Sequence, residues 1–181
     1  DDITLANNMS FSGNLVEQAA NTTYYQDVVV ASGNGNVTNS VTVNANAIQN
    51  TGGTGNAQVV FSWTNNSVQP TVTITAKKIN NIGGAVSGAT INDGDFRNDT
   101  QFVRVFFVTS EATTDFTDNG VATITNGSIT NITSTNGSTT EYQADVTPSG
   151  NSEVTINVAA GAFTSNVGNN NQAASFSFTY D

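Results

Sequence analysis

The stretch SFSFTY at residues 175–180 alternates aromatic with small hydroxyl residues, and this alternation predicts the fold class. A period of two places successive side chains on opposite faces of a β-strand, so that one face can be apolar. The same alternation recurs at 71–75 (TVTIT), 103–107 (VRVFF), 121–125 (VATIT) and 154–158 (VTINV). Glycine and asparagine lie between these runs and helical periodicity is almost absent, so the sequence predicts an all-β sandwich or barrel.

The amino-acid composition excludes several kinds of functional site. The 181 residues include no Cys and no His, and four Lys and Arg stand against fourteen Asp and Glu, for a net charge of −10. A cysteine nucleophile, a Ser-His-Asp triad, a Cys/His zinc site and a disulfide framework are therefore excluded. So few cations also argue against nucleic acid and anionic membrane surfaces as partners.

The length and the ends of the chain bear on its organisation. A chain of 181 residues can form one large domain or two small β-domains. No apolar run reaches the roughly 18 residues of a membrane span, so we expect no membrane insertion. The N-terminal sequence DDITLANN lacks a signal-peptide pattern, and we expect a mature or excised fragment.

The chain contains an internal repeat. Residues 22–28 (TTYYQDV) align with 139–146 (TTEYQADV), and both are followed by Ser-Gly-Asn. The alignment also pairs 3–7 with 122–126, 43–48 with 158–163, and 59–64 with 174–179. Residues 1–66 therefore repeat residues 120–181.

The repeat predicts two unequal domains. Residues 70–181 form a complete repeat, whereas 1–66 are the C-terminal part of one, because the strands expected near 71–76 and 102–109 have no counterpart in them. Residues 67–69 are the expected linker, and Pro70 marks the boundary. So short a connection should limit how freely one domain swings on the other.

Several segments together resemble a known family. They are 70–75 (PTVTIT), the acidic loop 92–95 (NDGD) with Asn98 and Asp99, 109–116 (TSEATTDF), 158–164 (VAAGAFT), 168–171 (GNNN) and 176–181 (FSFTYD). They resemble bacterial Ig-like repeats, which occur in tandem in large surface adhesins. The resemblance implies tandem Ig-like β-sandwiches, the first incomplete at its N-terminus, that act as stalks and are often rigidified by calcium. Residues 77–91 are longer than the corresponding stretch of that pattern.

The acidic loop is the candidate metal site. Asp93, Asp95, Asn98 and Asp99 bring several hard oxygens together around Gly94, as calcium requires. The spacing is not that of an EF-hand, and the alternative is a solvated turn in which Asx side chains bond their own backbone. Asp115, Asp118 and Asp181 are weaker candidates for an interdomain ion.

The eight Asn-X-Ser/Thr sequons are close to the number expected by chance, so they permit glycosylation without indicating it. The best candidates are Asn126 and Asn136, because both precede glycine in expected turns. On the strand 102–108, Arg104 and Phe106 occupy the outward phase and could mark a subunit or domain contact. The alternative is an isolated exposed aromatic, or one covered by residues 77–91.

The predicted core positions share the inward phase of their strands. They are Val72, Ile74, Ile124, Tyr142, Ile156, Val158, Phe163, Phe176 and Phe178, with Tyr25, Val43, Phe61 and Trp63 in the first copy. No pair of carboxylates is arranged with an aromatic platform, so we expect no enzyme.

These features predict a non-enzymatic structural segment of an extracellular or cell-surface protein: a stalk, an adhesin spacer or a filament subunit. The alternatives are a carbohydrate- or protein-binding adhesion module and an accessory domain of a secreted hydrolase. The expected partners are neighbouring repeats of the same chain or identical subunits. Identical subunits could complete the first domain by donor-strand complementation.

Overall fold

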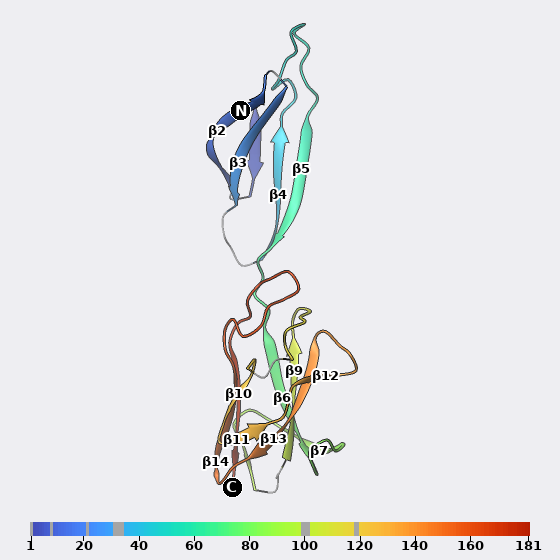
Figure 1. The fold of residues 1–181 in the computed structure, drawn as a ribbon, viewed down its shortest axis with the longest axis vertical. Helices are drawn as coiled ribbons and strands as arrows, with labels where there is room; N and C mark the ends of the chain where they lie inside the picture. The colour runs from blue at the N-terminus through green and yellow to red at the C-terminus, as the bar shows by residue number, and fades with distance from the viewer. Residues whose placement is uncertain (1, 8, 21, 31–34, 99–101, 118–119) are drawn as a thin grey trace. The chain divides into compact units, whose positions relative to one another are not determined.

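The computed structural model describes residues 2–7, 9–20, 22–30, 35–98, 102–117 and 120–181. Every regular element in the described part of the chain is a β-strand, which confirms the predicted all-β class (Figure 1). No helix long and apolar enough to cross a membrane occurs there. The chain divides into two compact units, Asp1–Val68 (unit 1) and Gln69–Asp181 (unit 2).

The first sheet of unit 2 is built around two long antiparallel strands, β6 (Val72–Ile79) and β9 (Phe102–Thr109). Its other strands are β7 (Val86–Ile91), β11 (Gly127–Ile129), β12 (Thr133–Ser134) and β13 (Glu141–Pro148). The order is β11-β13-β9-β6-β7, and β12 also pairs with β13. The apolar residues of one face stay in register across the sheet, because Ile74 lies opposite Phe107 and Phe107 lies opposite Tyr142.

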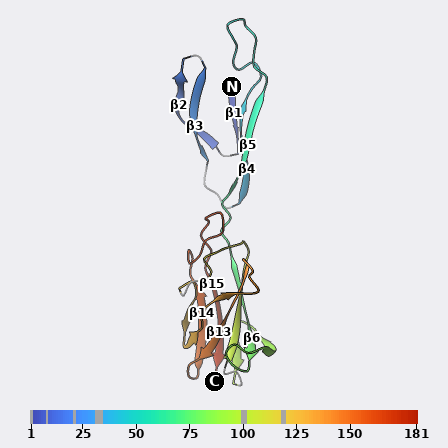
Figure 2. The same cartoon turned by 45° about the vertical axis from the view of Figure 1, so that its right-hand side comes forward.

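The second sheet of unit 2 has the order β10-β14-β15-β8. It comprises β10 (Thr123–Thr125), β14 (Ser152–Val158), β15 (Ala174–Tyr180) and β8 (Asp95–Arg97). The last strand, β15, lies between β14, to which it is antiparallel, and β8, to which it is parallel. Figure 2 shows β14 and β15 beside β13 and β6.

The core of unit 2 confirms the positions predicted for the second copy. Val72, Tyr142, Ile156, Val158, Phe163, Phe176 and Phe178 are buried, while Ile74 and Ile124 pack partly buried against them. The periodicity did not indicate Phe116, which lies on no strand. Its ring is fully buried, with centroids 5.3 Å from Phe107, 4.8 Å from Tyr142 and 4.9 Å from Phe163.

Unit 1 contains two separate sheets (Figure 2). One has the order β1-β4-β5 and comprises β1 (Ile3–Ala6), β4 (Asn36–Val43) and β5 (Val59–Asn66). The other is the antiparallel pair β2 (Met9–Ala19) and β3 (Thr23–Val30). The register of the first sheet repeats that of unit 2: Leu5 faces Val41 and Val41 faces Phe61, as Ile124 faces Ile156 and Ile156 faces Phe176.

The core predicted for the first copy was wrong. Tyr25 is 50% exposed and Phe61 66% exposed, while Val43 and Trp63 are only half-buried. Among the described residues of unit 1, no apolar side chain is buried. The physical reason is that the strands covering these positions in unit 2, β6 and β9, have no counterpart in residues 1–68.

Candidate functional site

An ion pair lies on the outward face of the first sheet of unit 2. Arg104 on β9 and Asp145 on β13 occupy paired positions. Arg104 points away from the core, because its neighbours Val103 and Val105 are fully buried. The Arg104 Nε lies 2.7 Å from Asp145 Oδ1, and Nη2 lies 3.0 Å from Oδ2. The two side chains are only 15% and 7% exposed. This bidentate geometry is the strongest form of a protein ion pair.

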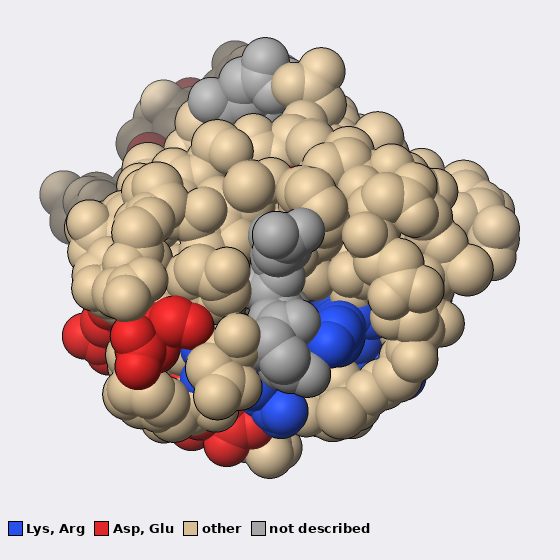
Figure 3. Space-filling model, turned by 90° about the horizontal axis from the view of Figure 1, so that it is seen from below, with Lys and Arg blue, Asp and Glu red and all other residues tan. Residues whose placement is uncertain are grey.

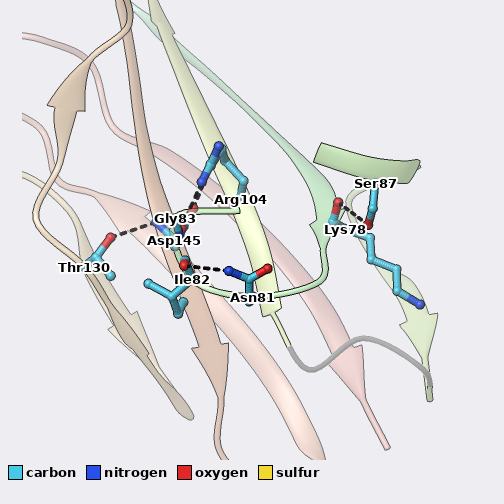
Figure 4. A network of polar contacts seen from close by, with 8 residues as sticks. All are labelled: Lys78, Asn81, Ile82, Gly83, Ser87, Arg104, Thr130 and Asp145. Carbon is cyan, nitrogen blue, oxygen red and sulfur yellow. Dashed lines mark hydrogen bonds and ion pairs between the residues drawn. The ribbon is translucent and has the colours of Figure 1, made fainter. Parts of the chain in front are cut away.

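The β6–β7 loop and the segment after β11 enclose this pair (Figure 4). The Gly83 N–H donates to Asp145 Oδ2 at 2.6 Å. Thr130 exchanges two hydrogen bonds of 2.8 Å with Asp145, from its own N–H to the carbonyl and from the Asp145 N–H to the Thr130 hydroxyl. The long 77–91 segment therefore folds back over its own sheet, and Arg104 has its partner inside unit 2. Phe106 is half-buried, and its interface role stays a prediction.

The pair has a defined electrostatic state. Burial raises the pKa of Asp145, but the Arg104 guanidinium and the Gly83 N–H together outweigh it, so that the pKa lies below its usual range. The hydrogen bond to Asp145 raises the pKa of Arg104. Both groups are charged at neutral pH, and the charges cancel locally.

A shallow hollow of about 360 Å³ lies beside the pair. Its walls carry the polar side chains of Asn131, Thr133 and Gln143 together with Ile82. Amides and hydroxyls can hydrogen-bond a neutral polar group, but none of these side chains is a nucleophile activated by a base. The described part of the chain contains no group of three or more acidic residues placed to hold a metal ion.

The acidic loop ties two strands together. Asp93 Oδ1 accepts a hydrogen bond of 2.6 Å from the Ser177 N–H on β15. Asp95 Oδ2 accepts from the Asn92 N–H at 2.9 Å and from Arg97 Nη2 at 3.1 Å. The Asn92 N–H contributes most to a lowered pKa of Asp95. Asn98 is exposed, Asp99 lies outside the described residues, and calcium binding by this loop stays a prediction.

Asp115 has a structural role that the sequence did not reveal. Its carboxylate accepts from the Thr113 hydroxyl at 2.5 Å and from the N–H and hydroxyl of Thr164 at 3.0 and 2.9 Å. Burial raises its pKa, but these hydrogen bonds outweigh burial and lower it overall. The exposed Asp181 donates its N–H to the Arg97 carbonyl at 2.8 Å, whereas Asp118 lies outside the described residues.

The two predicted glycosylation positions lie on exposed turns. Asn126 and Asn136 have positive φ angles of 56° and 52°, which asparagine tolerates better than most residues. Asn126 Nδ2 also donates to the Glu153 carbonyl at 2.8 Å, which fixes its side chain. Their accessibility is compatible with modification, and glycosylation stays a prediction.

Both units contain the same asparagine corner, defined here as Asn56 in unit 1 and Asn171 in unit 2. Each Oδ1 accepts from a backbone N–H, that of Ile48 at 2.8 Å and that of Phe163 at 2.9 Å. Each Nδ2 donates to two carbonyls, at 2.9 and 2.7 Å for Asn56 and at 2.8 and 2.7 Å for Asn171. Sequence reasoning aligned the flanking segments but did not single out this residue.

The cations of the chain all lie in unit 2, at Lys77, Lys78, Arg97 and Arg104. Figure 3 shows basic and acidic side chains close together on the face that is seen from below. Because both signs occur side by side, this face offers no uniform basic patch for an anionic polymer.

Comparison with known proteins agrees with this geometry. A family model described as a bacterial Ig-like domain matches residues 87–181, just over half of the chain. The match runs from within β7 to the residue after β15, so it includes the whole second sheet of unit 2 and every strand of the first sheet except β6. No curated protein matches the chain. The resemblance stated from the sequence is confirmed.

Proposed function

This chain belongs to the bacterial Ig-like domain family, and from that membership we propose that it is a non-enzymatic structural segment of an extracellular or cell-surface protein. The family is typically non-catalytic, and its domains often occur in surface proteins. The finer assignment is a spacer that resists mechanical tension, in which repeats separate other parts of a surface protein.

The observation that carries the proposal is the repetition of one hydrogen-bonded framework. Units 1 and 2 share the register of three strands and the asparagine corner. β5 ends at Asn66 and β6 begins at Val72, so five residues separate the last strand of unit 1 from the first strand of unit 2. Repetition with so short a connection is typical of spacers assembled from serial modules.

The strand order of unit 2 favours resistance to a pulling force along the chain. The chain enters unit 2 through β6 and leaves through β15, and these strands belong to different sheets. β6 is held to β9 over eight paired positions, from Val72–Thr109 to Ile79–Phe102. Ladder hydrogen bonds lie perpendicular to the strands, so a pull along β6 loads them together in shear.

Single-molecule stretching of the full chain between its two ends tests the proposal. Unit 2 is expected to resist until one discrete rupture, followed by an extension of about 3.5 Å per residue of that unit. The matched control is Val105→Asn, which removes a fully buried contact of β9 and should lower the rupture force. Gradual extension of unit 2 without a discrete event would refute the spacer role.

A further inference from the structure

Two strands of unit 2 have neighbours that their counterparts in unit 1 lack. In unit 2, β13 pairs with β9 on the side away from β11, and β15 pairs in parallel with β8. In unit 1 the corresponding strands are β3 and β5. Among the described strands, β3 pairs with β2 and β5 pairs with β4, and neither has a second neighbour. Both edges therefore have the position and direction of an acceptor for further strands.

The apolar side chains that unit 2 buries lie open in unit 1. Phe61, Ile48 and Tyr25 are 66%, 62% and 50% exposed. Their counterparts Phe176, Phe163 and Tyr142 are 4%, 1% and 3% exposed. In unit 2 the covering elements are β6, β9 and the ring of Phe116, which contacts both Tyr142 and Phe163. The exposed surface thus has the composition of half of a sandwich core.

One position of unit 1 that corresponds to a core residue of unit 2 carries a polar side chain. Asn39 is the counterpart of the core residue Val154, because each faces the aromatic residue of the last strand, Trp63 or Phe178. Asn39 is fully buried, and among the described residues its Oδ1 has no hydrogen-bond partner. Such an acceptor costs about 1–3 kcal/mol until a donor reaches it.

We infer that unit 1 is a strand acceptor, completed by a polypeptide segment with the sequence pattern of residues 69–117 of this chain. A β9-type strand pairs antiparallel with β3, a β8-type strand pairs parallel with β5, and an aromatic residue in the place of Phe116 covers Tyr25 and Ile48. The occupant is the front half of a repeat of this same kind. The inference rests on the proposed role as a serial module, because that role supplies such segments.

The single tryptophan of the chain, Trp63, reports on this site because it lies in β5. The test joins a second copy of residues 69–119 directly ahead of Asp1, which the alignment equates with Gly120. Trp63 emission is expected to move to shorter wavelength, and its quenching by acrylamide to fall about two-fold or more, because burial excludes water from the indole. Unit 1 should also gain a cooperative melting transition.

The matched control carries Val103→Asn, Val105→Asn and Phe107→Asn in the added copy alone. It leaves length and unit 2 unchanged but removes the apolar face of the donated strand. Equal protection of Trp63 by the control, or none by the intact segment, would overturn the inference. Concentration-dependent protection in the unextended chain would identify a second copy of unit 1 as the occupant and overturn it too. The stretching result on unit 2 is independent of all three outcomes.

Discussion

Phe61 and Phe176 occupy the same place in two copies of one framework, yet one is 66% exposed and the other 4%. Each faces a β-branched partner in register, Val41 or Ile156. The ladders and the asparagine corner form in both units, so contacts within one half of the repeat suffice for them. Burial, in contrast, comes from β6 and β9, which only unit 2 contains. In this chain the strand pairing therefore depends on contacts within half of the repeat, whereas the core needs both halves.

The most severe test of this comparison truncates the paired phenylalanines. Phe176→Ala should cost unit 2 about 3–5 kcal/mol of unfolding free energy, because it leaves a cavity in a packed core. Phe61→Ala should change stability by less than about 0.5 kcal/mol, because its side chain is largely exposed. Thermal and denaturant melts of both variants measure the difference, and equal losses would mean that unit 1 has a core of its own.

The second test uses the aligned aspartates. Asp145 is buried and paired with Arg104, whereas Asp27 of unit 1 is exposed. Arg104→Met leaves the Asp145 carboxylate without its ion-pair partner and should lower the unfolding free energy of unit 2 by about 2–4 kcal/mol. Lys77→Met, on the neighbouring strand and exposed, is the control and should stay within about 0.5 kcal/mol. A loss from Lys77→Met as large as that from Arg104→Met would show that general charge, not this pair, matters.

The third test removes the asparagine corner from each unit. Asn171→Ala leaves the Phe163 N–H and two carbonyls without their partner and should destabilise unit 2 by about 1–3 kcal/mol. Asn56→Ala is expected to act locally, seen as faster hydrogen exchange at the Ile48 amide and little change in the melt of unit 2. Global unfolding of both units by Asn56→Ala would contradict the division into independent halves.

The fourth test concerns acid. The folded-state pKa values of Asp145 and Asp115 lie below their ordinary values, so their contribution is present above about pH 4 and is lost as pH falls through the folded values. Unit 2 should therefore lose melting temperature in acid. Asp145→Asn should flatten this slope, and Asp27→Asn in unit 1 should leave it unchanged. A slope unaffected by Asp145→Asn would assign acid sensitivity to other groups.

The fifth test concerns calcium, which should act on unit 2 alone because unit 1 has no acidic loop. The Asp93 and Asp95 oxygens already accept hydrogen bonds from Ser177, Asn92 and Arg97. The melting temperature of unit 2 should therefore differ by no more than about 2 °C between calcium and EDTA. A large loss in EDTA, abolished by Asp93→Asn, would establish the ion site predicted from the sequence.

Sequence reasoning succeeded where the signal was periodic. The period of two located the strands of unit 2, their inward residues and the outward phase of Arg104. The repeat alignment matched Trp63 with Phe178, and their registers agree. In the first copy the same alternation predicted buried residues that are in fact exposed or half-buried. Burial also needs a covering layer, and the pattern of a single strand does not reveal whether that layer is present.

Contacts between distant segments escaped prediction. Arg104 and Asp145 are 41 residues apart, and nothing in either strand marks them as a pair. Phe116 lies between strands without periodicity, and the parallel pairing of the three-residue β8 with β15 leaves no pattern in its sequence. The acidic loop was recognised for its oxygens, but its bond to Ser177 depends on that same pairing.

The position of β15 between β14 and β8 also governs when the repeat can fold. Its residues, Ala174–Tyr180, are the last of the repeat to be synthesised, yet they fill the middle of a sheet. Until they arrive, β8 has no partner and the second layer cannot close. Contacts so distant along the chain slow the search for the native pairing. The second sheet of unit 2 therefore cannot be completed before its final strand is available.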